Sequence, residues 1–488
     1  MPSTSSKKPT PRRRRPTWWE RTVNAWFDRL FTATREGTWS EQEASTAAGE
    51  TRKDYIWNTA GLAVWGMMFP LFTILVTQLS GTERAGMFSL AFVTSQVLMI
   101  VGNFGARAYQ ASDTSERHSF LEYQVARWIT CAAMVAAGLF FFAVRGYDGE
   151  MRLICTGIMA YRALDCLADV YEGRLQQKDK LYLAGISQTV RSAVCFVVFS
   201  LLLLVSGSVA AASIAMAVAA VATFAVFTLP ITLFETKGSH ILRPPHIAAI
   251  FRQCWPLFAA MFLYTLTDNI PKFAIDGLLD YTSQLYFNAL YFPAQFVLIV
   301  GGFIYKPLIV RMADAWADAS GRAAFNGFVR RVALSIAGVT LAALVFFALA
   351  GIPLFGVLYG IDFESMRVLC LLMIVAGGFT GGIDFLYQVM TVVRNQNAII
   401  RSYLVAFVVA LCTSVALVFL LGLPGAVFAY LATMAVLFFS LVVEYLRVAR
   451  RGSGVDAGGE GGPGIGGGDG GGGPGASAGG KAGERGLA

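Results

Sequence analysis

The sequence predicts an all-α polytopic membrane protein with about 12 transmembrane helices in two six-helix bundles. Three observations predict this fold class. Hydrophobic residues make up 56% of the 488 residues and charged residues only 14%, against the roughly 25% charged residues of a soluble domain. Apolar stretches of about twenty residues, the length that crosses a bilayer, recur along the chain. One of these stretches is also written twice.

The repeated stretch runs from Phe88 to Arg107 and again from Phe287 to Lys306. Both copies are largely apolar and end on a cation, the form of a membrane helix with a snorkelling basic end. Repeats of this kind are typical of transporters, where the substrate path lies between the two halves. Shared membrane composition is the alternative explanation for part of the match. The identical positions are Phe88/Phe287, Gln96/Gln295, Ile100/Ile299, Val101/Val300, Gly102/Gly301 and Phe104/Phe303.

Twelve apolar segments of spanning length follow one another along the chain, six in each half. Because six is even, both halves cross the membrane in the same sense, and we expect them to be parallel repeats related by an axis along the membrane normal. The two copies of the repeat fall on spans two and eight. The first-half spans begin near Tyr55, Arg84, Gln124, Glu150, Leu183 and Val209. The second-half spans begin near Gln253, Ser283, Val332, Met366, Ile399 and Gly425.

These spans divide the chain into five segments. The first opens with a cluster of cations and then places Trp19, Val23 and Trp26 on one helical face, which predicts an interfacial helix on an anionic leaflet or else a disordered basic tail. The last is about half Gly and predicts a disordered extension. The segments are a cytoplasmic basic tail (1–52), an N-terminal six-helix bundle (53–234), a cytoplasmic linker (235–252), a C-terminal six-helix bundle (253–450) and a Gly-rich cytoplasmic tail (451–488).

The distribution of Lys and Arg predicts the orientation of the chain. With a cytoplasmic amino terminus, only Arg84, Arg145, Arg152 and Arg367 of the 39 basic residues fall outside, and four more lie within spans. We therefore expect a multi-pass protein of the plasma (inner) membrane with both termini cytoplasmic. The links expected on the outer side are very short, so no extracytoplasmic domain is large enough to hold an active site.

Motifs for catalysis and for metal binding are missing from the sequence. It contains no P-loop, G-x-S-x-G, H-E-x-x-H or metal-spaced cluster. The seven cysteines show no C-x-x-C spacing, and we expect them to act as small packing residues. His118, His240 and His246 fall in predicted cytoplasmic loops. We expect no enzymatic activity, no catalytic residue, no metal, no nucleic-acid partner and no cofactor besides a coupling ion, Na⁺ or H⁺.

Charged residues inside the predicted spans are the strongest functional signal. Each costs roughly 2.5 to 3.5 kcal/mol at a helix centre, so they must face a polar interior. Span four carries three charges on one helical face. The predicted intramembrane charges are Arg162, Asp165 and Asp169 on span four, Arg191 on span five, Asp268 and Lys272 on span seven, and Asp384 on span ten.

Two interpretations of these charges stay open. In the first they neutralise one another, because Arg162 can reach Asp165 and Asp268 can reach Lys272 along their own helices. In the second, Arg162, Arg191 and Lys272 bind an anionic headgroup, since guanidinium donates two parallel hydrogen bonds to phosphate. The carboxylates are then candidates for ion coupling: Asp165, Asp169, Asp268 and Asp384.

The repeat also places Arg107 and Lys306 at equivalent depths, as a basic inner mouth for a diphosphate or as ordinary snorkelling cations. Glycines interrupt span ten, and prolines flank the glycine pair of span eight. They indicate either hinges or close helix packing. The residues are Gly377, Gly378, Gly381 and Gly382 in span ten and Pro293, Gly301, Gly302 and Pro307 in span eight.

Several blocks resemble polysaccharide flippases of the Wzx type, in the polysaccharide branch of the superfamily that also holds multidrug extruders and peptidoglycan-precursor flippases. The resemblance covers spans one to eight, and the last four spans match only by position and hydropathy. The blocks are Asn58 with Gly86, Phe88, Ser89 and Leu90; NFGARAYQASD (103–113); YRALDCLADVYEGRLQQKDKL (161–181); DNIPKFAID (268–276); and YFPAQFV (291–297).

The resemblance implies a transporter that moves a polyprenyl-diphosphate-linked oligosaccharide from the inner to the outer leaflet by alternating access between two bundles. Its implied partners are that lipid, membrane lipids and other polysaccharide-assembly membrane proteins. A cation-coupled multidrug extruder of the same superfamily is the alternative, although its cavity should be acidic and aromatic. A membrane glycan polymerase is the third hypothesis, and the short outer links argue against it.

Overall fold

The computed structural model describes residues 47–236, 241–317, 322–393 and 395–456, and within these ranges every regular element is a helix. The predicted interfacial helix near Trp19 and most of the Gly-rich tail lie outside the described residues. The chain divides into two compact units, Met1–Val442 and Val443–Ala488, so that the first unit contains every helix except the end of the last one. The all-α fold class is confirmed.

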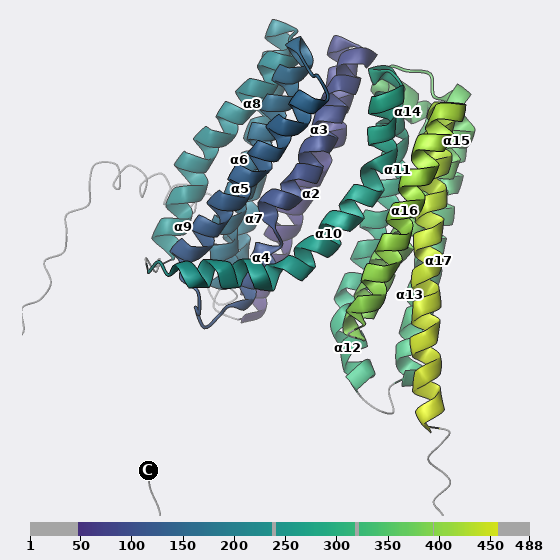
Figure 1. Ribbon diagram of the computed structural model, residues 1–488. Helices are drawn as coiled ribbons and strands as arrows, with labels where there is room; N and C mark the ends of the chain where they lie inside the picture. Colours follow the sequence, from purple (N-terminus) through teal and green to yellow (C-terminus); the bar gives the residue numbers. More distant parts are fainter. Residues whose placement is uncertain (1–46, 237–240, 318–321, 394, 457–488) are drawn as a thin grey trace, which may run out of the picture. The chain divides into compact units, whose positions relative to one another are not determined.

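The helices of the first half run up and down beside one another (Figure 1). A π-helical turn, Phe224–Thr228, joins α8 to α9 without interrupting the span. The helices are α2 (Ala47–Ser80), α3 (Thr82–Asn103), α4 (Ala106–Ser112), α5 (Phe120–Val144), α6 (Gly149–Gln177), α7 (Leu181–Ser206), α8 (Val209–Thr223) and α9 (Leu229–Glu235).

The second half follows the same order of long helices. Short 3₁₀ turns, Lys306–Leu308 and Glu364–Met366, and a π-helical turn, Phe347–Gly351, lie at the junctions of its helices. The helices are α10 (Pro244–Leu278), α11 (Tyr281–Tyr305), α12 (Ile309–Ala317), α13 (Arg322–Phe346), α14 (Ile352–Tyr359), α15 (Arg367–Val392), α16 (Gln396–Leu421) and α17 (Leu423–Asp456).

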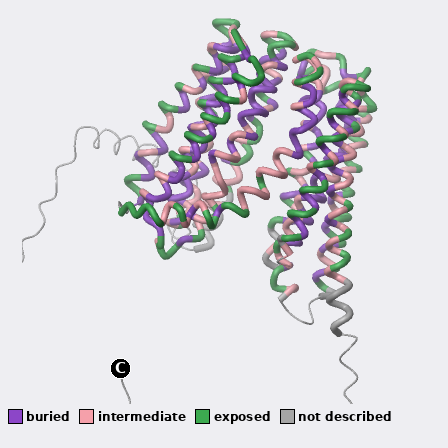
Figure 2. The backbone as a smooth tube through the Cα atoms, viewed as in Figure 1, coloured by how far each residue is buried: buried purple, intermediate pink, exposed green. Residues whose placement is uncertain are grey.

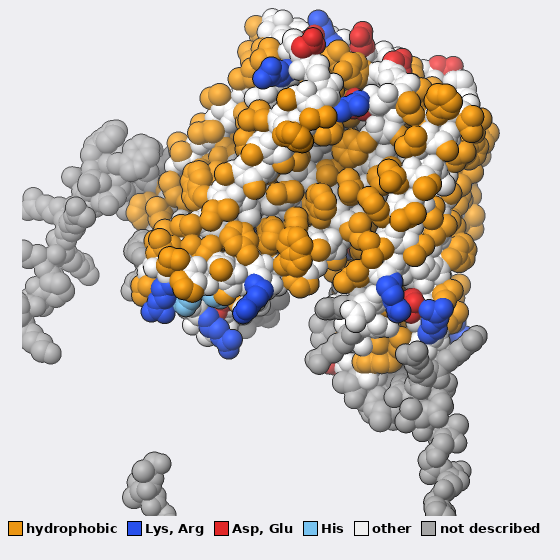
Figure 3. Space-filling model, in the orientation of Figure 1, with side chains coloured by type: hydrophobic (Ala, Val, Ile, Leu, Met, Phe, Trp, Pro, Cys, Tyr) orange, Lys and Arg blue, Asp and Glu red, His pale blue; other side chains and the backbone are white. Residues whose placement is uncertain are grey.

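Eleven helical segments of the described chain are long and apolar enough to cross a membrane. The twelfth predicted span is α6, whose 29 residues reach about 43 Å at 1.5 Å per residue. It is long enough to cross a membrane, but it carries more charged residues than the other eleven segments allow. Hydrophobic side chains cover the middle of the visible face, with charged side chains at its ends (Figure 3). Exposed apolar side chains such as Phe140 and Leu349, 72% and 77% accessible, suit contact with lipid, while the helical backbone satisfies its own hydrogen bonds.

Several helix boundaries differ from the sequence prediction, and α13 begins at Arg322 instead of near Val332. Helix α2 begins at Ala47, before the predicted start near Tyr55. Helix α10 begins at Pro244, inside the predicted 235–252 linker, because proline at the first helical positions needs no backbone N–H partner. Helix α17 continues to Asp456, into the predicted tail. Apolar periodicity detects the part of a helix inside the bilayer and misses its polar extensions.

The internal repeat is visible in the helix packing. In the first half α3 packs against α5 and α6, and α2 packs against α7. In the second half α11 packs against α13 and α15, and α10 packs against α16. The repeated helices α3 and α11 also contact one another, and Phe88 and Phe287 are both fully buried. Burial is concentrated where helices face their neighbours (Figure 2). The same arrangement in both halves supports a duplicated bundle.

The glycines of α15 serve close helix packing, one of the two predicted roles. A Cβ atom on Gly377 would lie 2.6 Å from Ala294 Cα of α11, and one on Gly378 would lie 2.7 Å from Thr340 Oγ1 of α13. One on Gly382 would lie 2.5 Å from the Phe438 ring of α17. Helix α15 is continuous through these positions. Three neighbouring helices therefore approach α15 at a distance that a side chain would prevent.

The links at the end of the helices predicted to face outside are short, as expected. The link from α14 to α15 has seven residues, three of them in a 3₁₀ turn, and the others have at most four. Single glycines, Gly81 and Gly422, join α2 to α3 and α16 to α17. Both glycines have positive φ, 86° and 64°, a conformation that favours residues without Cβ. The described links at this end contain no separate domain.

Candidate functional site

Seven charged side chains of the first half form one continuous ladder of ion pairs, which we call the arginine ladder. Cations and carboxylates alternate along it, and four different helices, α4 to α7, contribute to it. In order of contact its members are Arg162, Asp165, Arg191, Glu172, Arg107, Asp169 and Arg127.

The first part of the ladder is almost completely buried. Arg162 contacts Asp165 at 3.2 Å, and Asp165 also accepts a 2.9 Å hydrogen bond from Arg191 Nε. Arg191 Nη1 then donates to Glu172 Oε1 at 2.7 Å. The side chains of these four residues are only 2% exposed. Arg191 therefore connects two carboxylates of α6 that lie two turns apart.

The second part of the ladder begins at the other oxygen of Glu172. Arg107 lies 3.6 Å from this oxygen and donates to Asp169 at 2.8 Å. Arg127 donates to the second oxygen of Asp169 at 2.7 Å and also to the Gly102 carbonyl oxygen. Arg107, with 29% of its side chain exposed, is the most accessible cation of the ladder.

Local sequence explains how the ladder assembles. Arg162, Asp165, Asp169 and Glu172 share one face of α6 because they are three or four residues apart. After α3 the backbone turns through left-handed conformations at Phe104 and Gly105, φ 48° and 66°. A glycine favours that conformation, and the turn starts α4, which packs on α6 and carries Arg107.

Aromatic rings enclose the Arg162 end of the ladder. The Arg162 guanidinium lies 4.2 Å from the Phe92 ring centroid and 4.9 Å from that of Trp65. Trp65 Nε1 also donates to Asp165 at 3.1 Å. Arg162 Nε has no hydrogen-bond partner among the described residues. Cation–π contacts stabilise a guanidinium without consuming its N–H donors, so donors of Arg162 stay available.

The structure brings together five of the nine predicted site residues. Arg107, Asp165 and Asp169 join the two predicted arginines Arg162 and Arg191 in one network. Sequence reasoning missed two further members, Arg127 and Glu172. Their only sequence signal is a charge near a span end, where snorkelling is the ordinary explanation. The predicted contact between Arg162 and Asp165 is confirmed.

The second half holds a smaller polar cluster around Asp268. Tyr291 and Tyr430 donate to its two carboxylate oxygens at 2.7 and 3.0 Å. Lys272 lies 3.9 Å from Asp268, donates to Asn269 at 2.8 Å and sits 3.7 Å from the Tyr291 ring centroid. The predicted pair of Asp268 and Lys272 is present, and tyrosine hydroxyls are the shorter partners of the carboxylate.

Asp384 and Lys306 lie apart from these clusters. Asp384 accepts a hydrogen bond from Tyr305 at the end of α11. Lys306 is exposed, and among the described residues no ion pair includes it. The repeat thus places Arg107 and Lys306 at equivalent helix ends, yet Arg107 is bound to Asp169 while Lys306 is accessible. The two cations are therefore equivalent in their position along the chain, but their charged neighbours differ.

Polar contacts join the two halves at the ends of α2, α5, α10 and α14, which are predicted to face outside. Arg145 pairs with Asp276 at 2.6 Å, and the Tyr147 hydroxyl donates to the same carboxylate at 2.8 Å. Burial and the Asp276 carboxylate raise the pKa of Tyr147, so this hydroxyl remains a donor. Gln78 Nε2 donates to the Leu358 carbonyl oxygen at 2.9 Å. We call these contacts the outer latch.

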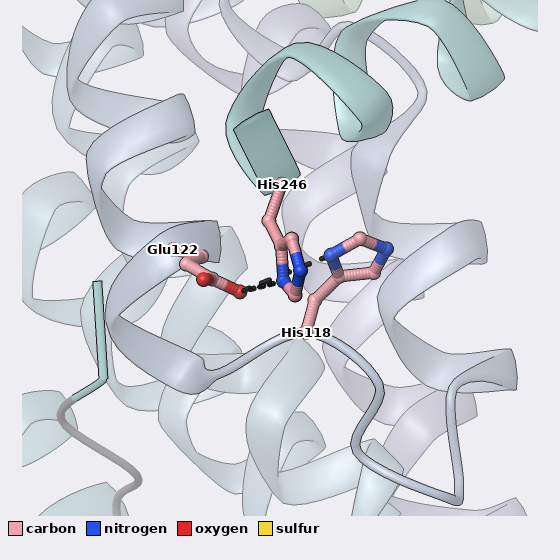
Figure 4. A group of neighbouring side chains, drawn as sticks. All are labelled: His118, Glu122 and His246. Carbon is pink, nitrogen blue, oxygen red and sulfur yellow. Dashed lines mark hydrogen bonds and ion pairs between the residues drawn. The ribbon is translucent and has the colours of Figure 1, made fainter. Parts of the chain in front are cut away.

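A third group of side chains has functional potential. Sequence reasoning found no metal-spaced cluster, but the fold places His118, Glu122 and His246 side by side (Figure 4). They come from the α4–α5 loop, the first turn of α5 and the first turn of α10. The signal was not visible in the sequence because more than a hundred residues separate His246 from the other two.

A cavity of about 400 Å³ lies on another face of the first half, between α5, α6 and α8. Val135, Ala160, Leu167 and Val218 are among its mainly apolar lining residues. It lacks a charged lining residue and suits a hydrocarbon chain better than a phosphate. The polar clusters and this cavity are therefore different features.

No protein-family model matches the chain, and no curated protein matches it. Solved structures are similar to it. A multidrug resistance MATE family transporter of the MOP superfamily, in an inward-facing conformation, has a TM-score of 0.61 at 13% identity, over 82% of this chain and 99% of that one. The lipid II flippase MurJ, in an inward closed conformation, has a TM-score of 0.62 at 12% identity, over 83% of this chain and 89% of that one.

A MOP superfamily transporter from Pyrococcus furiosus, described by the reverse polarity of its binding pocket, is also similar. Its TM-score is 0.54 at 14% identity, over 84% of this chain and 96% of that one. These likenesses extend over almost the whole of each relative. The chain therefore has the fold of the MOP superfamily transporters.

Proposed function

We propose that this protein is a membrane transporter, and specifically a flippase that moves a polyprenyl-diphosphate-linked oligosaccharide between leaflets for polysaccharide synthesis. The arginine ladder carries the proposal. Four arginines face three carboxylates, so the ladder holds one more positive than negative charge. A buried surplus of guanidinium favours an anionic cargo, and guanidinium binds phosphate oxygens in pairs.

The blocks that resemble Wzx-type flippases coincide with the polar clusters. The first two long blocks contain Arg107 and the α6 carboxylates of the ladder. The last two contain Asp268, Lys272 and Tyr291, which contact one another. The blocks therefore mark two polar clusters, one in each half. This coincidence supports the polysaccharide branch over the wider superfamily.

Alternating access between the halves is the proposed mechanism. The outer latch holds the two halves together at one end of the helices. Opening the outer latch would give the arginine ladder access to the outer leaflet. With both termini in the cytoplasm of a plasma (inner) membrane, as the positive-inside rule predicts, cargo enters from the inner leaflet. Asp268 and Asp384 are the proposed carboxylates for Na⁺ or H⁺ coupling.

A cation-coupled multidrug extruder is the second candidate. The second half favours it, because the charges of Asp268, Lys272 and Asp384 sum to one negative charge and both carboxylates accept hydrogen bonds from tyrosine hydroxyls. An acidic and aromatic pocket suits organic cations. The two candidates thus differ in which half binds the cargo.

Lipid analysis of a strain that lacks this gene tests the proposal. Polyprenyl-diphosphate oligosaccharides should accumulate in the cytoplasmic leaflet and should clear when the wild-type gene is restored. Arg162→Ala should fail to clear them while the protein inserts at wild-type levels. Arg84→Gln removes a half-exposed arginine, 46% accessible, that pairs with Glu150 outside the ladder, and should restore export.

An unchanged lipid pool would overturn the flippase proposal. Resistance of overexpressing cells to cationic dyes, lost in Asp268→Asn, would then support the multidrug extruder. Clearance by Arg162→Ala at the wild-type rate would remove Arg162 from the mechanism. Each outcome separates cargo identity from protein insertion, because insertion is measured independently.

A further inference from the structure

We propose that His118, Glu122 and His246 form a binding site for a divalent transition metal, with Zn²⁺ as its reference ion. The inference does not depend on the transported cargo. Glu122 Oε2 lies 3.3 Å from His246 Nδ1 and 3.8 Å from His118 Nδ1. Ligand atoms of all three residues lie within 4.8 Å of one another. Adjacent ligand atoms of tetrahedral zinc are about 3.3 Å apart when the bonds are 2.0 to 2.1 Å.

His118 presents an unused nitrogen to this centre. His118 is only 7% exposed, and its Nδ1 has no hydrogen-bond partner among the described residues. Its Nε2 lies 3.1 Å from the Tyr109 hydroxyl. A proton on Nε2 leaves a lone pair on Nδ1, which faces a carboxylate that cannot donate. A cation between Nδ1 and Glu122 would satisfy both groups. The Tyr109 hydroxyl at the other ring nitrogen would orient the histidine, as hydrogen-bond partners of metal-binding histidines commonly do.

Backbone groups hold the other partners in position. The Ser119 N–H donates to Glu122 Oε2 at 2.8 Å, as part of the capping box that starts α5. The Arg243 N–H donates to Oε1 at 3.0 Å. A carboxylate has about four lone-pair positions, so these contacts leave room for a metal. Asp113 accepts the His118 N–H at 3.0 Å, which fixes the backbone of the histidine.

The donor set selects the class of ion. Two imidazoles and one carboxylate match the three protein ligands of zinc sites that keep one position for water. Imidazole also excludes Ca²⁺ and Mg²⁺, which take oxygen ligands. The side chain of His246 is 32% exposed, and Figure 4 shows it between Glu122 and His118. The cluster is therefore accessible from one side.

The site would join α10 to the first half. His246 lies in the first turn of α10, and Ile250 and Cys254 of that helix already pack in a core with Phe120 and Tyr123 of α5. The same helix continues to α11 and α16 in the second half. A metal at this point would fix the start of the helix that connects the halves.

Zinc titration of the purified full-length chain, made without a histidine tag and freed of metal by chelation, tests the site. We expect one equivalent of Zn²⁺ to bind and to raise the unfolding temperature, and Co²⁺ to give the visible spectrum of a tetrahedral site. His118→Gln and His246→Gln should each weaken binding at least tenfold, since even outer partners of metal ligands contribute roughly 10- to 100-fold.

Cys412→Ser and His240→Gln are the matched controls. Cys412 is an exposed free thiol and the chain has no histidine besides His240 and the two proposed ligands. Both controls should bind zinc as the wild type does. Failure of the folded wild type to bind Zn²⁺ overturns the proposal and leaves an ordinary histidine–carboxylate contact. Wild-type affinity in both histidine variants, or loss of binding confined to a control, also overturns it.

Discussion

At the residue scale, the arginine ladder determines how single substitutions act. Each inner member contacts two groups of opposite charge, so its removal leaves two buried charges with one partner fewer. Removing one partner of a buried pair costs about 3–5 kcal/mol, because the remaining charge stays desolvated. Outside the ladder, exposed pairs contribute only about 0–1 kcal/mol. The energetic cost of removing an arginine therefore depends more on whether its ion pairs are buried than on how many contacts it makes.

Arg191→Gln tests this difference. Arg191 connects Asp165 and Glu172, and we expect its substitution to destabilise the first half by about 3–5 kcal/mol. Arg84→Gln, which removes the surface pair with Glu150, should cost at most about 1 kcal/mol. Thermal unfolding in detergent measures both. Equal shifts in the two variants would contradict the account of the ladder.

Sequence reasoning identified part of this site. It found the charges that lie deep in spans, because Arg162, Asp165 and Arg191 have no ordinary reason to be in a bilayer. It missed Glu172, which lies where a polar residue is unremarkable in sequence. The contacts depend on the fold, since the turn at Gly105 decides which carboxylate Arg107 reaches. Spacing along one helix cannot supply that information.

At the element scale, close packing and capping define the helices. The contact between α3 and α11 depends on Gly86, where a Cβ atom would lie 1.8 Å from the Tyr281 carbonyl oxygen. The helical class and eleven of the twelve predicted spans were predictable from apolar stretches of spanning length. The ends of α2, α10 and α17 were not, because polar residues continue these helices beyond the apolar stretch.

Gly86→Ala should separate α3 from α11. The methyl group has no space against a backbone atom, so we expect a loss of about 1–3 kcal/mol, as for other overpacked sites. Gly338→Ala in α13 is the control, because a Cβ atom there would meet nothing within 4 Å, and it should gain up to about 1 kcal/mol in helix propensity. Unfolding temperatures in detergent should change in opposite directions. A neutral Gly86→Ala would mean that α3 and α11 are less closely packed.

Asp280 gives a pH-dependent test of a helix end. Its side chain accepts the Ser283 N–H at 2.9 Å as the cap of α11. Hydrogen bonding by the Ser283 side chain, and then by this N–H, lowers the pKa of Asp280 below its usual value. A carboxylate whose pKa is lowered by folding stabilises the protein above its unfolded pKa of about 3.9. That contribution is lost as the pH falls through the lower folded value.

Asp280→Ala should therefore cost about 1 kcal/mol at neutral pH and progressively less in acid. Asp280→Ser keeps a capping oxygen without the charge, so its difference from Asp280→Ala should not change over the same pH range. Unfolding temperatures from pH 7 to pH 3 provide the measurement. A cost of Asp280→Ala that is independent of pH would contradict the assigned role of the charge.

At the scale of the whole molecule, a repeated helix packing in two halves and a latch between them underlie our proposal of alternating access. The packing of α3 with α5 and α6 is repeated by α11 with α13 and α15. The halves are joined by the packing of α3 against α11 and by the few polar contacts of the outer latch. A cycle would alternate between the state with the latch formed and one with it open.

A disulfide across the latch should stop this cycle. The pair Gln78→Cys and Leu358→Cys, placed in a Cys412→Ser background, is the test, because the Gln78 side chain contacts the Leu358 backbone. Formation of the disulfide under oxidation is first verified by mass spectrometry. Transport should stop on oxidation and return on reduction. Each variant that carries only one of the two introduced cysteines should transport under both conditions. Full transport by the cross-linked pair would contradict alternating access through this latch.

The most direct test of the central claim is flipping by the purified protein in liposomes. A fluorescent polyprenyl-diphosphate-linked oligosaccharide is incorporated, and its transfer between leaflets is followed with a membrane-impermeant quencher. We predict transfer with wild type and Arg84→Gln, and transfer at the protein-free rate with Arg162→Ala. The same lipid without its diphosphate should move poorly. Transfer by Arg162→Ala at the wild-type rate, or none by the folded wild type, would contradict the claim that the arginine ladder serves an anionic lipid-linked cargo.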